Sequence, residues 1–152
     1  MGRWYELGDQ ISKDIKEAVE LIVKAADQKY PAAVKWIEKK RRGNDSKIHI
    51  EVGLYLESSK VPKIADGAFE WYELAAKIGD PDAAYLVGMW WRFRKMNIEK
   101  ALHWLHIAAE RGQIESQLEL SKWYSHGFGV DINLWEAEKW KKRAISALNE
   151  MS

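Results

Sequence analysis

The feature that most constrains the fold of this chain is an internal repeat. Three segments, AFEWYELAAKIG (68–79), ALHWLHIAAERG (101–112) and AEKWKKRAISAL (137–148), each begin with alanine, carry tryptophan three residues later and a small residue four residues beyond. Spacings of three and four place these side chains along one stripe of an α-helix. The small residues let a second helix approach closely, while the tryptophan fills the space beside it. The residues at these positions are Ala68, Ala101 and Ala137, then Trp71, Trp104 and Trp140, then Ala75, Ala108 and Ala144.

A second helical segment precedes each of these three. The segments are HIEVGLYL (49–56), AYLVGMWW (84–91) and QLELSKWY (117–124), and each has a small residue followed three positions later by a large one. These pairs are Gly53 and Leu56, Gly88 and Trp91, and Ser121 and Tyr124. A unit of two antiparallel helices therefore recurs, with steps of 33 and 36 residues between its tryptophans. This recurrence predicts an all-α fold, an α/α superhelical solenoid of stacked antiparallel helix pairs.

Capping signals mark the expected helix ends. Asp80-Pro81 offers an N-cap followed by proline at the first helical position. Asn97 can cap the helix that starts at Ile98, and Asn133 with Glu136 fits a capping box. Three glycines stand where a left-handed residue would end a helix, namely Gly43, Gly79 and Gly112.

The loop near the C-terminus holds two glycines, Gly127 and Gly129, between two helical patterns. Such glycines either cradle a ligand or turn the chain. A phosphate cradle requires a preceding strand and a longer glycine fingerprint, and the sequence predicts neither. We therefore expect both glycines to turn the chain with positive φ.

These residues together resemble the Sel1-like repeat, a relative of the tetratricopeptide repeat. Residues 117–145 carry nearly the whole motif, including Val130 of its GxGV loop, with Ser121 where the family usually has glycine. Residues 83–112 match with a shortened loop, and residues 49–79 match in both helices with a divergent loop, ESSKVPKIADG. The resemblance implies stacked helix pairs that serve as adaptors for protein assemblies.

The chain of 152 residues is most simply one domain. We expect Sel1-like repeats over residues 45–80, 81–112 and 113–149. Residues 1–44 are interpreted as a degenerate repeat or an N-terminal cap. Within them we expect a short helix, a helix over about 14–28 and a helix from Pro31 to Arg42.

Composition excludes several classes of function. Lys and Arg number 24 against 23 Asp and Glu, so no global charge favours nucleic acid or an anionic membrane as a partner. The chain has no cysteine, which excludes disulfides and thiolate metal sites. No signal-peptide core and no apolar run of about 18 residues is present, so we expect a soluble cytoplasmic protein. The basic run from Lys39 to Arg42 ends a predicted helix, where cations complement the helix dipole, and this interpretation is favoured over a nucleic-acid patch.

One helix carries a stripe of potential metal ligands. Glu99, His103, His106 and Glu110 are spaced by four, three and four residues, so they share one face. The apolar face of the same helix lies opposite, and no converging ligand from another element is identifiable. We expect the stripe to face water and to hold no metal, with a metal-dependent enzyme as the less favoured alternative. We expect no cofactor.

The aromatic residues Tyr55, Trp90 and Trp123 fall at one repeat position, directly before Leu56, Trp91 and Tyr124. They form either part of the core or an exposed ladder that binds a partner. Two arginines close to Trp90, Arg92 and Arg94, favour binding because Trp and Arg are enriched at interface hot spots.

The resulting prediction of function is a non-enzymatic protein–protein interaction module. A narrower hypothesis is a bacterial cytoplasmic immunity protein, an inhibitor that binds a cognate toxin. The alternative is a general adaptor of a regulatory assembly. An RNA-binding repeat is disfavoured because the residues after the aromatic position, Glu57, Arg92 and Ser125, do not repeat a basic charge.

Overall fold

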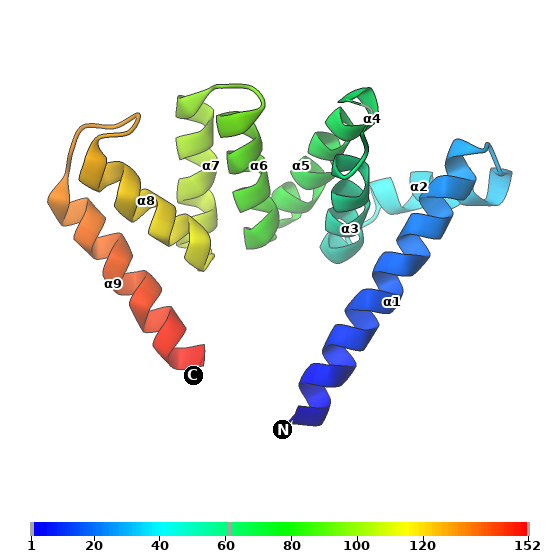
Figure 1. Ribbon diagram of the computed structural model, residues 1–152, viewed down its shortest axis with the longest axis horizontal. Helices are drawn as coiled ribbons and strands as arrows, with labels where there is room; N and C mark the ends of the chain where they lie inside the picture. The colour runs from blue at the N-terminus through cyan, green and yellow to red at the C-terminus, as the bar shows by residue number, and fades with distance from the viewer. Residues whose placement is uncertain (1, 61, 152) are drawn as a thin grey trace. The chain divides into compact units, whose positions relative to one another are not determined.

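The protein is described by a computed structural model that covers residues 2–60 and 62–151, with side-chain burial given for residues 14–60 and 64–151. Every regular element in these ranges is an α-helix (Figure 1), which confirms the predicted all-α fold. The helices are α1 (Gly2–Asp27), α2 (Pro31–Arg42), α3 (Ser46–Glu57), α4 (Pro62–Asp66), α5 (Ala68–Ile78), α6 (Pro81–Phe93), α7 (Ile98–Glu110), α8 (Ile114–His126) and α9 (Leu134–Met151). Among these residues no helix combines the length and apolarity needed to cross a bilayer.

Two elements differ from the sequence prediction. Residues 2–27 form one continuous helix, α1, where a short helix followed by a second one was expected. Gly8 lies inside α1. The helix tolerates it because an isolated glycine costs only about 1 kcal/mol relative to alanine. The divergent loop after α3 contains the short helix α4.

The helices pack into two compact units, residues 1–78 and residues 79–152. In the N-terminal unit α1 packs on α2 and α3, and α3 packs on α5. Val19 and Val23 of α1, one helical turn apart, meet Val52 of α3 and Trp71 of α5 in a shared core. The expected single domain stays a prediction.

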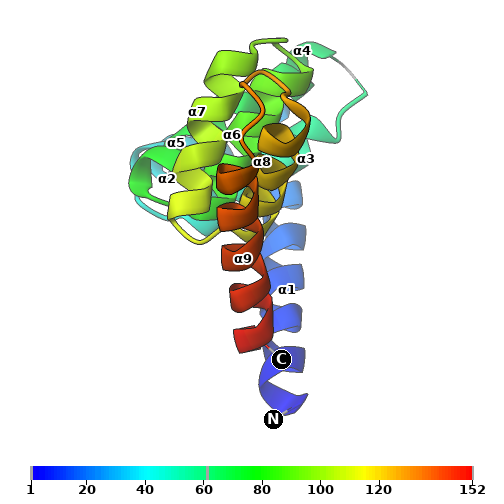
Figure 2. The ribbon, with the colours of Figure 1, turned by 90° about the vertical axis from the view of Figure 1, so that its left-hand side faces the viewer.

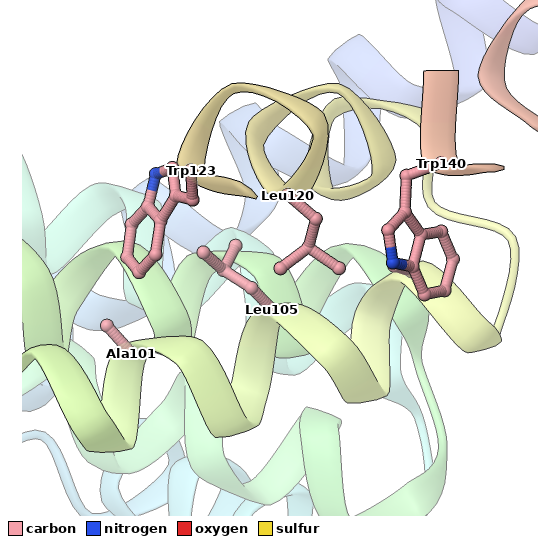
Figure 3. Close-up of a cluster of buried hydrophobic side chains, with 6 residues drawn as sticks. Ala101, Leu105, Leu120, Trp123 and Trp140 are labelled. Carbon is pink, nitrogen blue, oxygen red and sulfur yellow. The ribbon is translucent and has the colours of Figure 1, made fainter. Parts of the chain in front are cut away.

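In the C-terminal unit α6 packs on α7 and α8 packs on α9, while α7 also packs on α8. Figures 1 and 2 both show α6 and α7 side by side, joined by a short loop. Figure 3 shows Leu105 of α7 and Leu120 of α8 pointing toward each other, with Trp123 and Trp140 on either side. Three successive helices thus share one apolar core.

Small residues lie where the helices of a pair meet. A Cβ added at Gly53 would overlap the Tyr72 ring of α5, and one added at Gly88 would lie 3.3 Å from Leu105 of α7. The alanines of the repeat stripe are buried as well, namely Ala68, Ala75, Ala101, Ala108, Ala137 and Ala144. The spacing of these small residues therefore sets how closely the paired helices approach.

The three predicted N-terminal caps are present. The Asp80 side chain accepts from the backbone N–H of Ala83 at 3.0 Å. Asn97 accepts from the N–H of Lys100 at 3.0 Å, and Asn133 accepts from that of Glu136 at 3.1 Å. Each cap satisfies a backbone donor that the first helical turn leaves unpaired.

The glycines that were expected to end helices or turn the chain differ in backbone conformation. Gly79 and Gly112 have φ values of 119° and 93°, in the left-handed region expected for a helix terminus. Gly127 and Gly129 in the loop between α8 and α9 have φ values of 72° and 68°. The prediction was wrong for Gly43, whose φ of −83° is extended, because the chain continues there directly into the Asp45 cap of α3.

We predict that Gly127→Ala destabilises the protein by about 1–2 kcal/mol, since a side chain is disfavoured at this positive φ. The added Cβ would also lie 2.9 Å from Ile132 Cγ1. Gly43→Ala is the matched control, because its φ suits any residue and its nearest neighbours lie at 3.5 Å. Chemical denaturation followed by circular dichroism measures both variants, and equal stabilities would contradict the account of Gly127.

Candidate functional site: a cleft between α6 and α8

A single arginine of the C-terminal unit lies among three aromatic rings. The guanidinium carbon of Arg92, on α6, is 4.8 Å from the centroid of Phe93 and 5.3 Å from that of Trp123 on α8. It is 5.0 Å from the ring of Phe128, which follows α8. Cation–π contacts of this kind are each worth about 0.5–1 kcal/mol at exposed sites and more when desolvated.

A carboxylate fixes this arginine in place. Arg92 Nη1 donates to Glu119 Oε2 at 3.1 Å, and the same oxygen accepts from Trp123 Nε1 at 3.2 Å. Lys122 Nζ approaches the other oxygen, Oε1, at 3.9 Å. Trp123 and Phe128 meet edge to face at 4.9 Å. The arginine, the carboxylate and the rings therefore form one connected network.

The network borders a cleft of about 280 Å³. Its lining residues are Arg92, Glu119, Lys122, Trp123, His126 and Phe128. Phe93 and Phe128 leave 65% and 41% of their surface exposed, so the apolar rings are accessible to a partner. Aromatic residues and arginine are both enriched in protein–protein interfaces relative to the rest of the surface.

The structure shows how deeply the three aromatic residues of the possible ladder are buried. Trp90 and Trp123 are only 4% and 2% exposed, so both rings belong to the interior of the C-terminal unit. Trp123 packs into the core beside Ala101 and Leu105, which explains its burial. Tyr55 is half-buried against the core of the N-terminal unit. The core alternative therefore holds for Trp90 and Trp123, while Tyr55 is only partly buried.

The two arginines named from the sequence differ in setting. Arg92 joins Trp123 in the cleft, as described above. Arg94 is exposed, and its guanidinium lies 4.7 Å from the ring of Trp90, outside the lining of the cleft. Of the five residues expected to bind a partner, only Arg92 and Trp123 line the cleft.

Four lining residues were not identified from the sequence: Glu119, Lys122, His126 and Phe128. Glu119 carried a usable signal, because the repeat alignment places it where α6 has the apolar Leu86. A carboxylate at that position requires a partner, and Arg92 supplies it. Phe128 lies within the glycine loop, where the repeat pattern predicts no packing role.

A family model described as the Sel1 repeat matches residues 1–30, 50–80, 81–113 and 114–147. The chain belongs to the Sel1 repeat family. A crystal structure of a Sel1 repeat protein from Oxalobacter formigenes is similar, with 23% identity and a TM-score of 0.66, over 95% of this chain and 63% of that one. This likeness shows the fold alone, and the chain spans less than two thirds of that protein. Curated protein sequences yield no match.

Sel1 repeats are protein–protein interaction modules and in general non-catalytic scaffolds. The motif residues that carry the resemblance lie between residues 49 and 148, and the family model extends it to residues 1–30. The divergent loop with α4 falls inside the matched range 50–80.

The tryptophans of the Sel1 motif are buried to different degrees. Trp71 and Trp140 are 3% and 1% exposed, so both belong to the core. Trp104 is half-buried. Trp140 lies 5.9 Å from His106 of α7, on another helix, whereas Trp104 meets the ring of its own neighbour His103 at 5.8 Å.

We predict that Trp140→Ala lowers the free energy of unfolding by about 3–5 kcal/mol, because the ring fills a packed interior. Trp104→Ala should cost clearly less, since part of its ring surface already meets water. Thermal and chemical denaturation of the two variants provide the comparison. A larger loss for Trp104→Ala than for Trp140→Ala would contradict the difference in burial.

The stripe of histidines and glutamates on α7 does not act as a unit. Glu99, His103 and Glu110 are exposed, as expected, but His106 is half-buried. Its Nε2 lies 2.9 Å from the Tyr124 hydroxyl of α8. No group of three or more His, Asp or Glu side chains in the described part of the chain is placed to hold a metal ion.

Burial lowers the pKa of His106 below its usual 6.5, because desolvation disfavours the charged ring. Nearby carboxylates of Glu136 and Glu110 oppose this effect, while Lys139 and His103 add to it. Burial likewise raises the pKa of Tyr124, with Glu136 contributing. The neutral forms of both groups therefore suit this contact between α7 and α8.

We predict that stability falls as the pH drops through about 6.5, because the unfolded chain then binds a proton that folded His106 resists. The loss should level off below the folded-state pKa, where both states are protonated. His106→Gln should remove this component from melting temperatures measured between neutral and mildly acidic pH. The exposed His103→Gln is the control, and an equal effect of the two variants would contradict the assignment.

Proposed function

We propose that this Sel1 repeat protein is a non-enzymatic binding module that uses the cleft between α6 and α8 to recognise a segment of another protein. The observation that carries the proposal is the arginine held among three rings by Glu119. A side chain fixed before binding loses little rotational freedom on association, which favours affinity. The cleft also combines exposed apolar surface with exposed charge, as recognition sites do.

The chemistry of the cleft indicates the kind of segment that it accepts. Glu119 carries one negative charge against the two positive charges of Arg92 and Lys122, which leaves one net positive charge among the lining residues, and Glu119 lies closer to Arg92 than to Lys122. The ring of Phe128 in the lining, and that of Phe93 beside Arg92, offer apolar contact. We therefore expect a segment with an apolar or aromatic side chain next to a carboxylate.

A narrower form of the proposal is a bacterial cytoplasmic immunity protein that inhibits a cognate toxin or effector domain. A preformed site supports this role, because tight inhibitor complexes change little in backbone on binding. A general adaptor is the alternative. The two differ in one observable: an inhibitor blocks the activity of its bound partner at equimolar ratio, whereas an adaptor leaves that activity unchanged.

A photo-crosslinking residue at Lys122 identifies the partner, with the same residue at Lys142 on α9 as the control site. Affinity is then measured with the purified partner. We predict that Phe128→Ala and Lys122→Ala weaken binding roughly tenfold to thirtyfold, corresponding to about 1.4–2 kcal/mol. The melting temperature of Lys122→Ala should stay nearly unchanged, because surface substitutions cost within about 0.5 kcal/mol.

Lys142→Ala is the charge-matched control, since Lys142 is exposed and does not line the cleft. The proposal fails if Lys122→Ala and Phe128→Ala leave the affinity within twofold of the wild type. It also fails if Lys142→Ala weakens binding as much as Lys122→Ala, because the contact would then be general electrostatic attraction.

A further inference from the structure

An apolar groove of about 300 Å³ lies between α1 and α2 in the N-terminal unit. The described residues that line it are all apolar or aromatic, namely Leu21, Ile22, Ala25, Ala32, Ala33 and Trp36. Leu21 is 68% exposed, so a large apolar side chain at the groove meets water. An occupant of this groove must be apolar, and the repeat pattern of the chain indicates which segment it is.

The second half of α1 has the sequence of the second helix of a repeat. Ala18, Leu21 and Ala25 follow the motif spacing of three and four residues, with Leu21 at the position of the tryptophan. Lys29 ends this pattern with a positive φ of 63°, as Gly79 does with a φ of 119° at the same distance from its motif alanine. In sequence, residues 14–29 therefore match a helix that another helix of the same repeat covers.

A signal for the start of a helix lies in the middle of α1. Asp14 comes four residues before Ala18, the same spacing that separates the caps Asn97 and Asn133 from their motif alanines. Glu17 follows three residues after Asp14, which gives a capping box like the one that begins α9. Aspartate favours caps over helix interiors, because its carboxylate competes for backbone N–H groups. The sequence thus marks Asp14 as the beginning of a helix, although α1 continues through it.

The motif positions of α1 are open in the straight helix. Ala18 is exposed, whereas Ala68, Ala101 and Ala137 at the same position of the other repeats are buried. Figures 1 and 2 both show the first turns of α1, in dark blue, projecting away from α2, α3 and α5. A covering first helix is therefore what distinguishes the other repeats from this one.

The first half of α1 has the residue that such a covering helix needs. In the α6–α7 pair Gly88 of the first helix meets Leu105, four residues after the motif alanine of the second. The residue at that position in α1 is Ile22, which lines the groove, and the preceding half of the helix supplies Gly8. The Sel1 model likewise matches residues 1–30 as one unit. The register of the repeats thus pairs Gly8 with Ile22.

We infer that residues 2–11 fold back on the rest of α1 as a separate helix, with a turn at residues 12–14, and cover the groove between α1 and α2. The straight α1 is then the open form of a two-state equilibrium. The folded form hides Leu21 and Trp36, whereas the straight form leaves the groove free. The first turns of α1 therefore control whether another protein can reach this apolar surface.

This inference does not depend on the proposed function of the α6–α8 cleft. The described linings of the groove and of the cleft have no residue in common. The test below measures a distance within α1 and needs no binding partner. Failure of either proposal is therefore recognisable without reference to the other.

The test measures the distance between nitroxide labels at Arg3→Cys and Asp27→Cys by electron paramagnetic resonance, in a chain that has no cysteine of its own. These sites are 24 residues apart, which corresponds to about 36 Å in a straight helix. In a hairpin the helix axes lie about 8–10 Å apart, so the labels should come within about 25 Å of each other. We expect a population at the shorter distance. Labels at Glu138→Cys and Glu150→Cys, both within α9, calibrate an unbroken helix at about 18 Å.

Two variants should shift the equilibrium toward the straight form. Leu21→Glu should lower the ratio of short to long distances about tenfold, because the folded form buries the new charge. Asp14→Ala should lower it about fivefold, the effect of one lost helix cap. Val34→Glu is the matched control for Leu21→Glu, since Val34 is an exposed apolar residue of α2 outside the groove lining, and it should leave the ratio within twofold. Melting temperatures verify that the variants fold.

Three results would overturn the inference. The first is a distribution that holds only the distance near 36 Å, which would mean that α1 stays straight. The second is an equal effect of Leu21→Glu and Val34→Glu, because the groove would then not be the contact. The third is a short distance that disappears when labelled chain is diluted with unlabelled chain, which would place the segment of a second copy in the groove.

Discussion

Close approach of paired helices, made possible by glycine and alanine, is the constraint on which the rest of this structure depends. A Cβ at Gly53 would overlap Tyr72, and the alanines of the repeat stripe are buried. With the helices this close, a large ring beside each contact fills the remaining space, as Trp71 and Trp140 do. Because interiors are packed to crystal-like density, even one added methylene at such a contact is felt. The repeat therefore preserves size at each position more strictly than polarity, and the polar faces are left to vary between repeats.

This difference between recurring size and varying polarity explains which parts of the fold the sequence could predict. Sizes recur with the period of the repeat, so the helix pairs, the small residues and the caps at Asp80, Asn97 and Asn133 were all predicted correctly. The predictions that were wrong relied on single residues or short fragments, whereas the backbone there depends on the longer segment around them. Two helices were expected within residues 1–28, but residues 2–27 form one helix that continues through Gly8. Gly43 was expected to end α2 with a positive φ. Its φ instead depends on the direction in which the chain continues into α3, and the residue type does not reveal that direction.

The candidate sites were less predictable, because they depend on contacts between positions that the repeat does not relate. Trp123 was named as part of either the core or an exposed ladder, and Arg92 as a nearby residue that favours binding. The two residues do meet, but the tryptophan is buried and the arginine lies over its ring. Glu119, which joins them, lies 27 residues from Arg92. His106 was expected to face water with the rest of its stripe, and its contact with Tyr124 depends on the approach of α8. In each case periodicity places the helix but not the side chain across from it.

Positive charge in the α6–α8 cleft takes two physically different forms. In the cleft, Glu119 lies 3.1 Å from Arg92, so much of the attraction that this arginine could offer to a partner is already satisfied within the protein. What Arg92 contributes there is a flat, fixed surface beside the rings, which selects shape and apolar contact. Lys122 has 70% of its side chain exposed, and its Nζ lies 3.9 Å from Glu119 Oε1. Attraction from Lys122 therefore extends outward and weakens with salt over a Debye length of about 8–10 Å. In the proposed site Arg92 thus supplies shape and Lys122 supplies charge, because Glu119 lies closer to the arginine than to the lysine.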